Sequence, residues 1–296
     1  MPPAATRSDR HPSRKRAGTM SARTFLITGV SQGLGRAFAE AALAAGHHVV
    51  GTVRHEAARA DFERIDPRRA KAVILDVTNF AATEPVVADV EREVGAIDVL
   101  VNNAGYGHEG ILEESPFDAL LRQFDVNVFG AVAMIKAVLP GMRARRRGHI
   151  INISSMAGLA ALPGIAFYTG SKFALEGISE VLSKEVRDFG IHVTAIAPGS
   201  FRTAWAGASM VRSERSIPDY DALFEPVRQA RERKSGRQAG DPAKAAKVLL
   251  DLVEAENPPV HLVLGGDALR LVRDRTAAFL AELDAWEDVS HSTDFD

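Results

Sequence analysis

A regular alternation of two kinds of segment begins at Thr24 and constrains the fold more than any other feature of the chain. Short runs rich in apolar and β-branched residues are each followed by an Ala-rich segment with helical spacing. The predicted strands are Thr24–Thr28, His48–Val53, Ala72–Leu75, Val99–Asn102, His149–Ser154, His192–Ala197 and His261–Leu264. The predicted helices occupy residues 34–45, 56–64, 80–94, 117–146, 168–189, 242–255 and 267–286.

Strands and helices that alternate in this way predict a parallel sheet covered by helices on both faces. Because crossovers between parallel strands are right-handed, a doubly wound α/β sheet, mainly of seven strands, is the simplest topology. Such sheets bind ligands beyond the carboxyl ends of their strands. We therefore expect the functional residues to follow directly after strands.

Two regions lie outside the alternation. Residues 1–20 are dominated by Pro, Arg and Ser, and we predict a disordered basic tail. We expect residues 21–296 to form one domain. Within it, residues 203–240 are long for a connection, and we predict a substrate lid, with a plain surface insertion as the alternative.

Composition excludes several classes of protein. The net charge of −2 argues against a nucleic-acid partner, and the absence of cysteine removes disulfides and thiolate metal sites. The apolar runs, such as Gly130–Val138, are too short for a membrane span, and no secretory signal is evident. The nine His residues, including His47, His48 and His108, show no metal-ligand spacing. We expect a cytoplasmic protein without a metal site.

A glycine-rich turn follows the first predicted strand, with the sequence Thr28-Gly-Val-Ser-Gln-Gly-Leu-Gly35. Gly29 permits a sharp turn with positive φ. Gly33 lets a pyrophosphate approach the backbone, and Gly35 lets the following helix pack close to the sheet. The amino end of that helix directs free N–H groups toward the phosphates. A tight turn without a ligand is the alternative interpretation.

This turn resembles the T-G-x-x-x-G-x-G turn of the short-chain dehydrogenase/reductases. The N-N-A-G element at residues 102–105 and Asp76 after the third strand also match that family. The resemblance implies a single-domain Rossmann-like fold that binds a nicotinamide dinucleotide. The cofactor-binding residues that it implies are Gly29, Ser31, Gln32, Gly33, Leu34, Gly35, Arg54, Asp76, Val77, Asn103, Ala104, Gly105, Tyr168, Lys172, Pro198, Gly199 and Thr203.

Tyr168 and Lys172 form a Y-x-x-x-K pair, which on a helix places both side chains on one face. A cation beside a phenol lowers the pKa of the phenol, so we expect Tyr168 to act as a general acid or base. Thirteen residues earlier, Ser155 ends the fifth strand, at the spacing of the family's catalytic serine. Asn127 matches the family's N-V-x-G element, which implies a role in a proton relay. Pro198, Gly199 and Thr203 match a stretch that binds the nicotinamide carboxamide.

The end of the second strand indicates which cofactor is preferred. NAD-binding sheets place an acid there to bind the ribose 2′-hydroxyl, but this chain has Val53 followed by Arg54. A guanidinium can bind the 2′-phosphate of NADP, so we predict NADP(H) rather than NAD. Gln32 departs from the basic residue that many NADP-preferring relatives carry, and Arg36 is a possible substitute.

The resemblance implies reversible hydride transfer between the nicotinamide and a carbonyl or secondary alcohol. The alternatives are a non-catalytic sensor of nicotinamide nucleotides and an epimerase or dehydratase of related fold. We expect the walls of the substrate site to come from Tyr106–Leu112, Met156–Phe167 and residues 203–240, which favour an apolar small molecule. A homodimer or homotetramer through the 117–146 and 168–189 helices is also expected.

Overall fold

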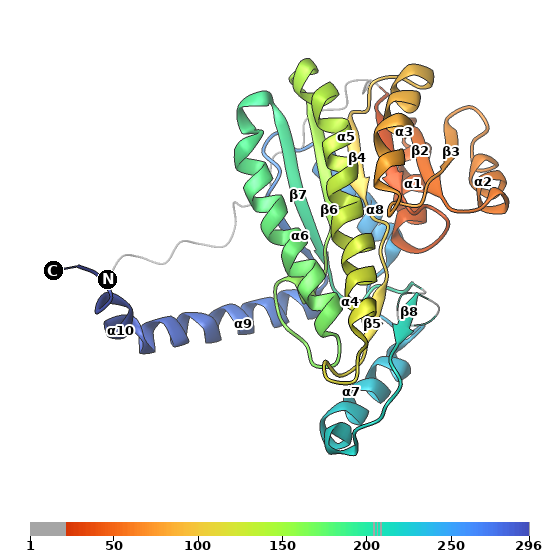
Figure 1. Cartoon of the computed structure of the whole chain (residues 1–296). Coiled ribbons are helices and arrows are strands. Elements are labelled where there is room, and N and C mark those ends of the chain that lie inside the picture. The colour runs from red at the N-terminus through yellow and green to blue at the C-terminus, as the bar shows by residue number, and fades with distance from the viewer. Residues whose placement is uncertain (1–21, 204, 206, 208, 296) are drawn as a thin grey trace.

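A seven-stranded parallel sheet forms the centre of the protein, as the computed structural model shows (Figure 1). The structure describes residues 22–203, 205, 207 and 209–295, so the predicted tail at 1–20 lies outside the described residues. The strand order is β3-β2-β1-β4-β6-β7-β9, which is doubly wound from the central β1 and β4. The strands are β1 Thr24–Thr28, β2 His48–Val53, β3 Ala70–Ile74, β4 Val99–Asn102, β6 Gly148–Ile153, β7 Ile191–Pro198 and β9 His261–Leu264.

Helices cover both faces of this sheet (Figure 1), which confirms the predicted fold class. Alternate residues of β1 point to opposite faces, because successive side chains of a strand alternate in direction. Phe25 and Ile27 pack with α1 (Gly33–Ala44) and α8 (Pro242–Val253). Leu26 faces the other layer, which is formed by α3 Phe80–Glu93, α5 Gly130–Arg145 and α6 Ala166–Glu185.

The predicted helix at 117–146 is interrupted in the structure. It consists of α4 (Phe117–Phe124), a π-helical turn over Asp125–Phe129 and then α5. Among the described residues this is the one helix long and apolar enough to cross a membrane, with a mean hydropathy of 1.4. Met134, Val138 and Met142 of α5 are buried in the sheet core. Packing on the sheet therefore accounts for the apolar character of that part of the helix.

The segment at 203–240 is more ordered than a loop. It contains a short strand, β8 (Met210–Arg212), and a helix, α7 (Asp221–Lys234). β8 pairs in parallel with β5 (Gly107–Glu109), which follows β4 in the chain. Sequence patterning missed both elements, because β8 is only three residues long and α7 carries many charges. Together they place the segment beyond the carboxyl ends of the central strands (Figure 1).

The last two elements form a projecting arm. They are α9 (Gly266–Ala285) and α10 (Glu287–His291). Figure 1 shows α9 extending away from the sheet. Ala268 is the buried residue of this helix, whereas Leu280, Leu283 and Trp286 are about half exposed or more. The remaining helix of the body, α2, spans Glu56–Glu63 at the edge beside β3.

Candidate active site

A cavity of about 1530 Å³ opens at the carboxyl edge of the sheet, where the sequence predicted the functional residues to lie. Its walls include residues that follow β1, β2, β3, β4, β6 and β7, together with parts of residues 203–240. Every residue predicted to bind the cofactor lines this cavity except Gly35. Ser155, Tyr168 and Lys172 line it as well, whereas Asn127 lies behind the wall.

The glycine turn forms one end of the cavity. Gly29 and Gly33 have φ values of 73° and 66°, in the left-handed region that favours glycine. A Cβ on Gly33 would meet only Thr203, at 3.8 Å, so the backbone there is open to a ligand. Gly35 has a different role, because a Cβ there would lie 2.3 Å from Nδ2 of Asn103. The absence of a side chain at Gly35 thus allows α1 and Asn103 to pack closely behind the turn.

Hydrogen bonds hold this turn against β4. Asn103 Nδ2 donates to the carbonyl oxygens of Thr28 and Gly29, at 2.9 and 3.0 Å. Thr28 Oγ1 accepts the backbone N–H groups of Asn103 and Ala104, both at 2.9 Å. Gln32 occupies the N-cap position of α1, but its side chain does not cap the helix. It donates instead to Ser209 Oγ at 3.2 Å, which leaves the amino end of α1 available to an anion.

Arg54 and Asp76 lie at the end of the cavity beside β2 and β3. The backbone N–H of Thr78 donates to Asp76 at 3.0 Å and lowers the pKa of that carboxyl, and the charge of Arg54 adds to the effect. Arg36 points elsewhere: it pairs with Glu40 at 2.6 Å and does not line the cavity. Arg54 is therefore the cation at this end, and Arg36 does not take the place of a basic residue at Gln32.

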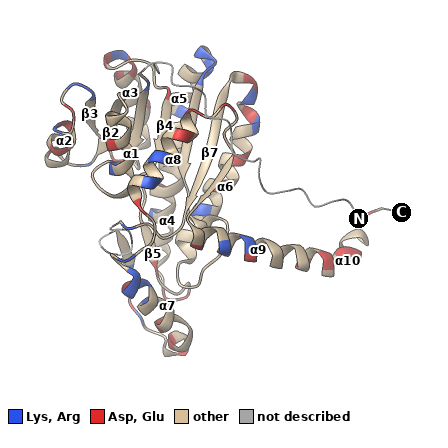
Figure 2. Ribbon diagram, turned by 180° about the vertical axis from the view of Figure 1, so that it is seen from behind, with Lys and Arg blue, Asp and Glu red and all other residues tan. Residues whose placement is uncertain are grey.

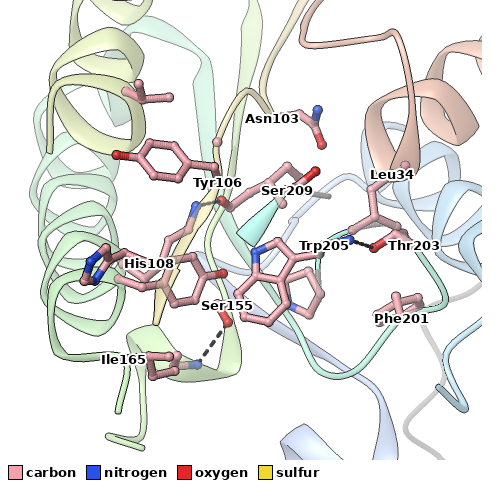
Figure 3. A pocket seen from close by; sticks show the side chains of 18 of the residues that line it. Leu34, Asn103, Tyr106, His108, Ser155, Ile165, Phe201, Thr203, Trp205 and Ser209 are labelled. Carbon is pink, nitrogen blue, oxygen red and sulfur yellow. Dashed lines mark hydrogen bonds between the residues drawn. The ribbon is translucent and has the colours of Figure 1, made fainter. Parts of the chain in front are cut away.

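Ser155, Tyr168 and Lys172 lie together in the middle of the cavity. The Lys172 ammonium lies 5.7 Å from the centre of the Tyr168 ring and donates to the carbonyl oxygen of Ile153 at 2.8 Å. Ser155 Oγ accepts the backbone N–H of Ala157 at 3.1 Å. Trp205 packs against Tyr168, with ring centroids 5.1 Å apart, and Figure 3 shows Trp205 and Ser155 facing the same space.

Burial controls the ionisation of the two central groups. It raises the pKa of Tyr168 to about 12, against a smaller lowering by the hydrogen bond with Ser155. It also lowers the pKa of Lys172 to about 8, which the carboxylate of Glu176 partly opposes. The expected lowering of the Tyr168 pKa by Lys172 is therefore not found: burial raises this pKa, and the lowering that opposes burial comes from Ser155. The phenol is therefore protonated at neutral pH.

The two serines after β6 differ in their partners. The Oγ of Ser155 is hydrogen-bonded, both to Ala157 and to Tyr168. The Oγ of Ser154 is buried and has no hydrogen-bond partner among the described residues. The catalytic role of Ser155, chosen from its spacing, stays a prediction.

Asn127 lies in the π-helical turn and is buried behind the cavity wall. Its Nδ2 donates to the carbonyl oxygen of Tyr106 and to Ser171 Oγ, both at 3.1 Å, and its Oδ1 accepts the N–H of Tyr106 at 3.2 Å. These bonds fix the start of the segment that leads to β5. Its role in a proton relay stays a prediction.

Two buried glutamates that sequence reasoning missed hold residues 203–240 in place. Glu109 pairs with Arg212 at 3.0 Å and with Arg231 at 2.9 Å. Glu114 pairs with Arg215 and accepts the N–H groups of Ser216 and Ile217, both at 2.7 Å. The partners are about a hundred residues apart in sequence, so no local pattern indicates the pairing.

Comparisons with known proteins agree with this geometry. The family profile described as short chain dehydrogenase matches residues 23–212. Oxidoreductase BOA17 of Botryotinia fuckeliana is 35% identical over 90% of this chain and 97% of its own length. The 3-ketodihydrosphingosine reductase of Bacteroides thetaiotaomicron is 37% identical over 83% of this chain and 89% of its own.

Solved structures show the same likeness. A short-chain dehydrogenase from Streptomyces avermitilis has a TM-score of 0.88 and 42% identity, and covers 94% of this chain and all of its own. A short-chain dehydrogenase/reductase from Burkholderia phymatum in complex with NAD has a TM-score of 0.78, covering 88% and 95%. ElxO with NADP bound has a TM-score of 0.70, covering 84% and 99%; both are 25% identical.

The chain belongs to the short-chain dehydrogenase/reductase family, as its motifs predicted. It is an oxidoreductase of the class that acts on CH–OH and C=O groups. Among the described residues, no group of three or more His, Cys, Asp or Glu side chains is arranged to hold a metal ion.

We expect the substitution Glu109→Gln to loosen residues 203–240, because it leaves Arg231 without its buried counter-charge. Limited proteolysis should cleave this segment at least about tenfold faster than in the wild type. Glu214→Gln is the matched control, since Glu214 is exposed and forms no ion pair among the described residues. Equal cleavage rates in both variants would show that the Glu109 pairs do not hold the segment.

Proposed function

We propose that this protein is an NADP(H)-dependent oxidoreductase that transfers a hydride between the nicotinamide and a carbonyl or secondary alcohol, with Tyr168 as proton donor and acceptor. One observation carries the proposal: the protonated, buried phenol of Tyr168 shares a single cavity with the open glycine turn. A dinucleotide bound at the glycine turn and a substrate beside Tyr168 could therefore occupy this cavity together.

Each polar side chain has a distinct task in this proposal. The uncapped amino end of α1 and the open backbone at Gly33 suit the phosphates of a dinucleotide. A nicotinamide held by these residues would supply or accept the hydride. Ser155 orients the substrate oxygen, and Tyr168 gives that oxygen its proton during reduction. Lys172 places a positive charge beside the phenol and stabilises the phenolate that this transfer leaves behind.

The direct test follows the near-ultraviolet absorbance of NADPH with a panel of apolar ketones, aldehydes and steroids. We expect turnover in the wild type, and a loss of about 100-fold or more in kcat for Tyr168→Phe, which keeps the ring but removes the proton donor. NADPH binding should survive in this variant. Undiminished turnover in Tyr168→Phe would refute its acid role. Cofactor binding without turnover of any carbonyl would favour the sensor, and redox-neutral conversion would favour the epimerase or dehydratase.

Preference for NADP(H) rests on Arg54. The related structures include one with NAD and one with NADP, so they support a nicotinamide cofactor without choosing between the two. In this chain Arg54 lines the cavity, and Val53 stands where an NAD-preferring sheet places its acid. A guanidinium at this position can form charge-assisted hydrogen bonds with a 2′-phosphate.

Arg54→Asp should shift the ratio of kcat/KM for NADPH to that for NADH toward NADH by about 100-fold, because it removes the guanidinium and adds a charge that repels the phosphate. Steady-state kinetics with both cofactors measure this ratio. Arg36→Asp is the control with the same change of charge, since Arg36 does not line the cavity. Our assignment of Arg54 would be wrong if both variants changed the ratio equally.

We also propose that the protein forms a homodimer or homotetramer through α4, the π-helical turn and α6. Five large apolar side chains are exposed on these neighbouring elements: Phe117, Leu121, Phe129, Phe173 and Val181. Exposed apolar side chains gathered on adjoining helices are typical of interaction surfaces. A second copy of the chain would cover them.

Leu121→Glu should weaken this association, because it places a charge within the apolar surface. Size-exclusion chromatography with light scattering should show an oligomer for the wild type and a monomer for the variant at micromolar concentration. Arg64→Glu, at an exposed position beside α2 at the β3 edge of the sheet, changes charge outside the 117–146 and 168–189 helices and should leave the oligomer intact. A wild-type monomer would refute the proposal.

A further inference from the structure

One face of α7 is turned toward the active-site cavity. The lining residues of this helix and of the turn that follows it recur every three or four positions, which is the spacing of one helix face. They are Pro226, Val227, Ala230, Arg231, Arg233, Lys234 and Arg237. The face is apolar in its first turns and strongly basic at its carboxyl end. Figure 2 shows basic residues of α7, in blue, on the part of the helix that lies nearer the sheet.

The cations on α7 differ in whether they have counter-charges. Arg228, away from the cavity, pairs with Glu225 at 2.6 Å and Glu232 at 2.7 Å. Arg231 pairs with the buried Glu109. Arg233, Lys234 and Arg237, all exposed, form no ion pair with any described residue.

Asp267 is the carboxylate that interacts with this corner: against the effect of burial, hydrogen bonds with Ser200 lower its pKa, and the charge of Lys234 adds to the lowering. Asp267 lines the same part of the cavity, but its oxygens accept the backbone N–H groups of Ser200 at 3.0 Å and Ala268 at 2.9 Å. Three cations therefore share one carboxylate that is already hydrogen-bonded. In a protein with a net charge of −2, this is a local excess of positive charge at the mouth of a cavity.

Apolar side chains form much of the cavity wall. Leu162, Ile165 and Trp205 pack with Tyr168. Val211 of β8 and Leu271 of α9 line the same cavity. A ligand whose carbonyl reaches Tyr168 would pass along this wall toward the basic end of α7. Such a ligand needs an apolar body and benefits from an anionic end.

We infer that the substrate is an amphiphile: an apolar carbonyl compound or alcohol with an anionic group, held by Arg233, Lys234 and Arg237. This inference rests on the proposed function and narrows its substrate class. A purely structural explanation exists, because cations in the last turn of a helix interact favourably with its dipole. That explanation predicts an effect on stability alone, and it requires neither a cavity-facing position nor the missing counter-charges.

Binding tests the inference independently of catalysis. We would titrate the protein, saturated with NADPH, with decanoate and with the uncharged decanamide in a calorimeter. Wild type should bind decanoate at least about tenfold more tightly, with the difference shrinking as salt is raised. The triple variant Arg233→Gln/Lys234→Gln/Arg237→Gln should lose this preference. Arg228→Gln, the matched control on the other side of α7, should keep it.

Kinetics supply the second measurement. A medium-chain keto acid, with its ketone at the far end from the carboxylate, is compared with the corresponding keto amide. The triple variant should lower kcat/KM for the keto acid about tenfold relative to the amide. An equal loss for both compounds, or a weakened affinity for NADPH with no change in the anion preference, would overturn the inference. Tyr168→Phe should abolish reduction yet retain the preference for decanoate, so the two proposals fail in different ways.

Discussion

Parallel pairing is the constraint on which the rest of the structure depends. In a parallel sheet all carboxyl ends meet at one edge, so residues that follow β1, β2, β4, β6 and β7 converge although they are distant in sequence. The bonds of Asn103 to Thr28 and Gly29 then lock the glycine turn onto the neighbouring strand. Without that lock the turn would be free to move relative to Ser155 and Tyr168, which stand on the next strand and its helix.

Desolvation is the second organising influence at the site. The same enclosure that raises the pKa of Tyr168 to about 12 lowers that of Lys172 to about 8. Both shifts favour neutral forms, as expected when charged groups leave water. At neutral pH the pair is thus a protonated phenol beside an ammonium whose proton is held less tightly than in water. A negative charge on the reacting oxygen or on a bound phosphate would favour the ammonium form of Lys172 further.

The sequence was sufficient to predict the sheet and its seven strands, and the residues that it singled out for cofactor binding, apart from Gly35, line one cavity. These predictions rest on local signals: short continuous runs of apolar and β-branched residues in strands that are buried on both faces, glycines at a turn, and the fixed spacing of Tyr168 and Lys172. The ends of elements were less exact, so that β3 begins at Ala70 rather than at Ala72. Gly35 and Asn127 were identified as site residues, yet the structure places both behind the cavity wall.

What the sequence did not reveal depends on contacts between distant segments. The pairing of β5 with β8 and the ion pairs of Glu109 join residues about a hundred positions apart. A three-residue strand has no periodicity to detect, and a charged helix such as α7 resembles an exposed surface segment until its neighbours are known. The π-helical turn around Asn127 was hidden for a related reason, since its residues continue the helical pattern on either side.

The hydrogen bond between Gln32 and Ser209 gives residues 203–240 a second attachment, at the glycine turn itself. The segment therefore touches the place where a dinucleotide would lie and also forms the wall against which a substrate would lie. Thermodynamic linkage is reciprocal: if a ligand at the turn orders the segment, a ligand at the wall must strengthen binding at the turn by the same factor. Any cooperativity between the two ligands is then a property of this one segment rather than of the sheet beneath it.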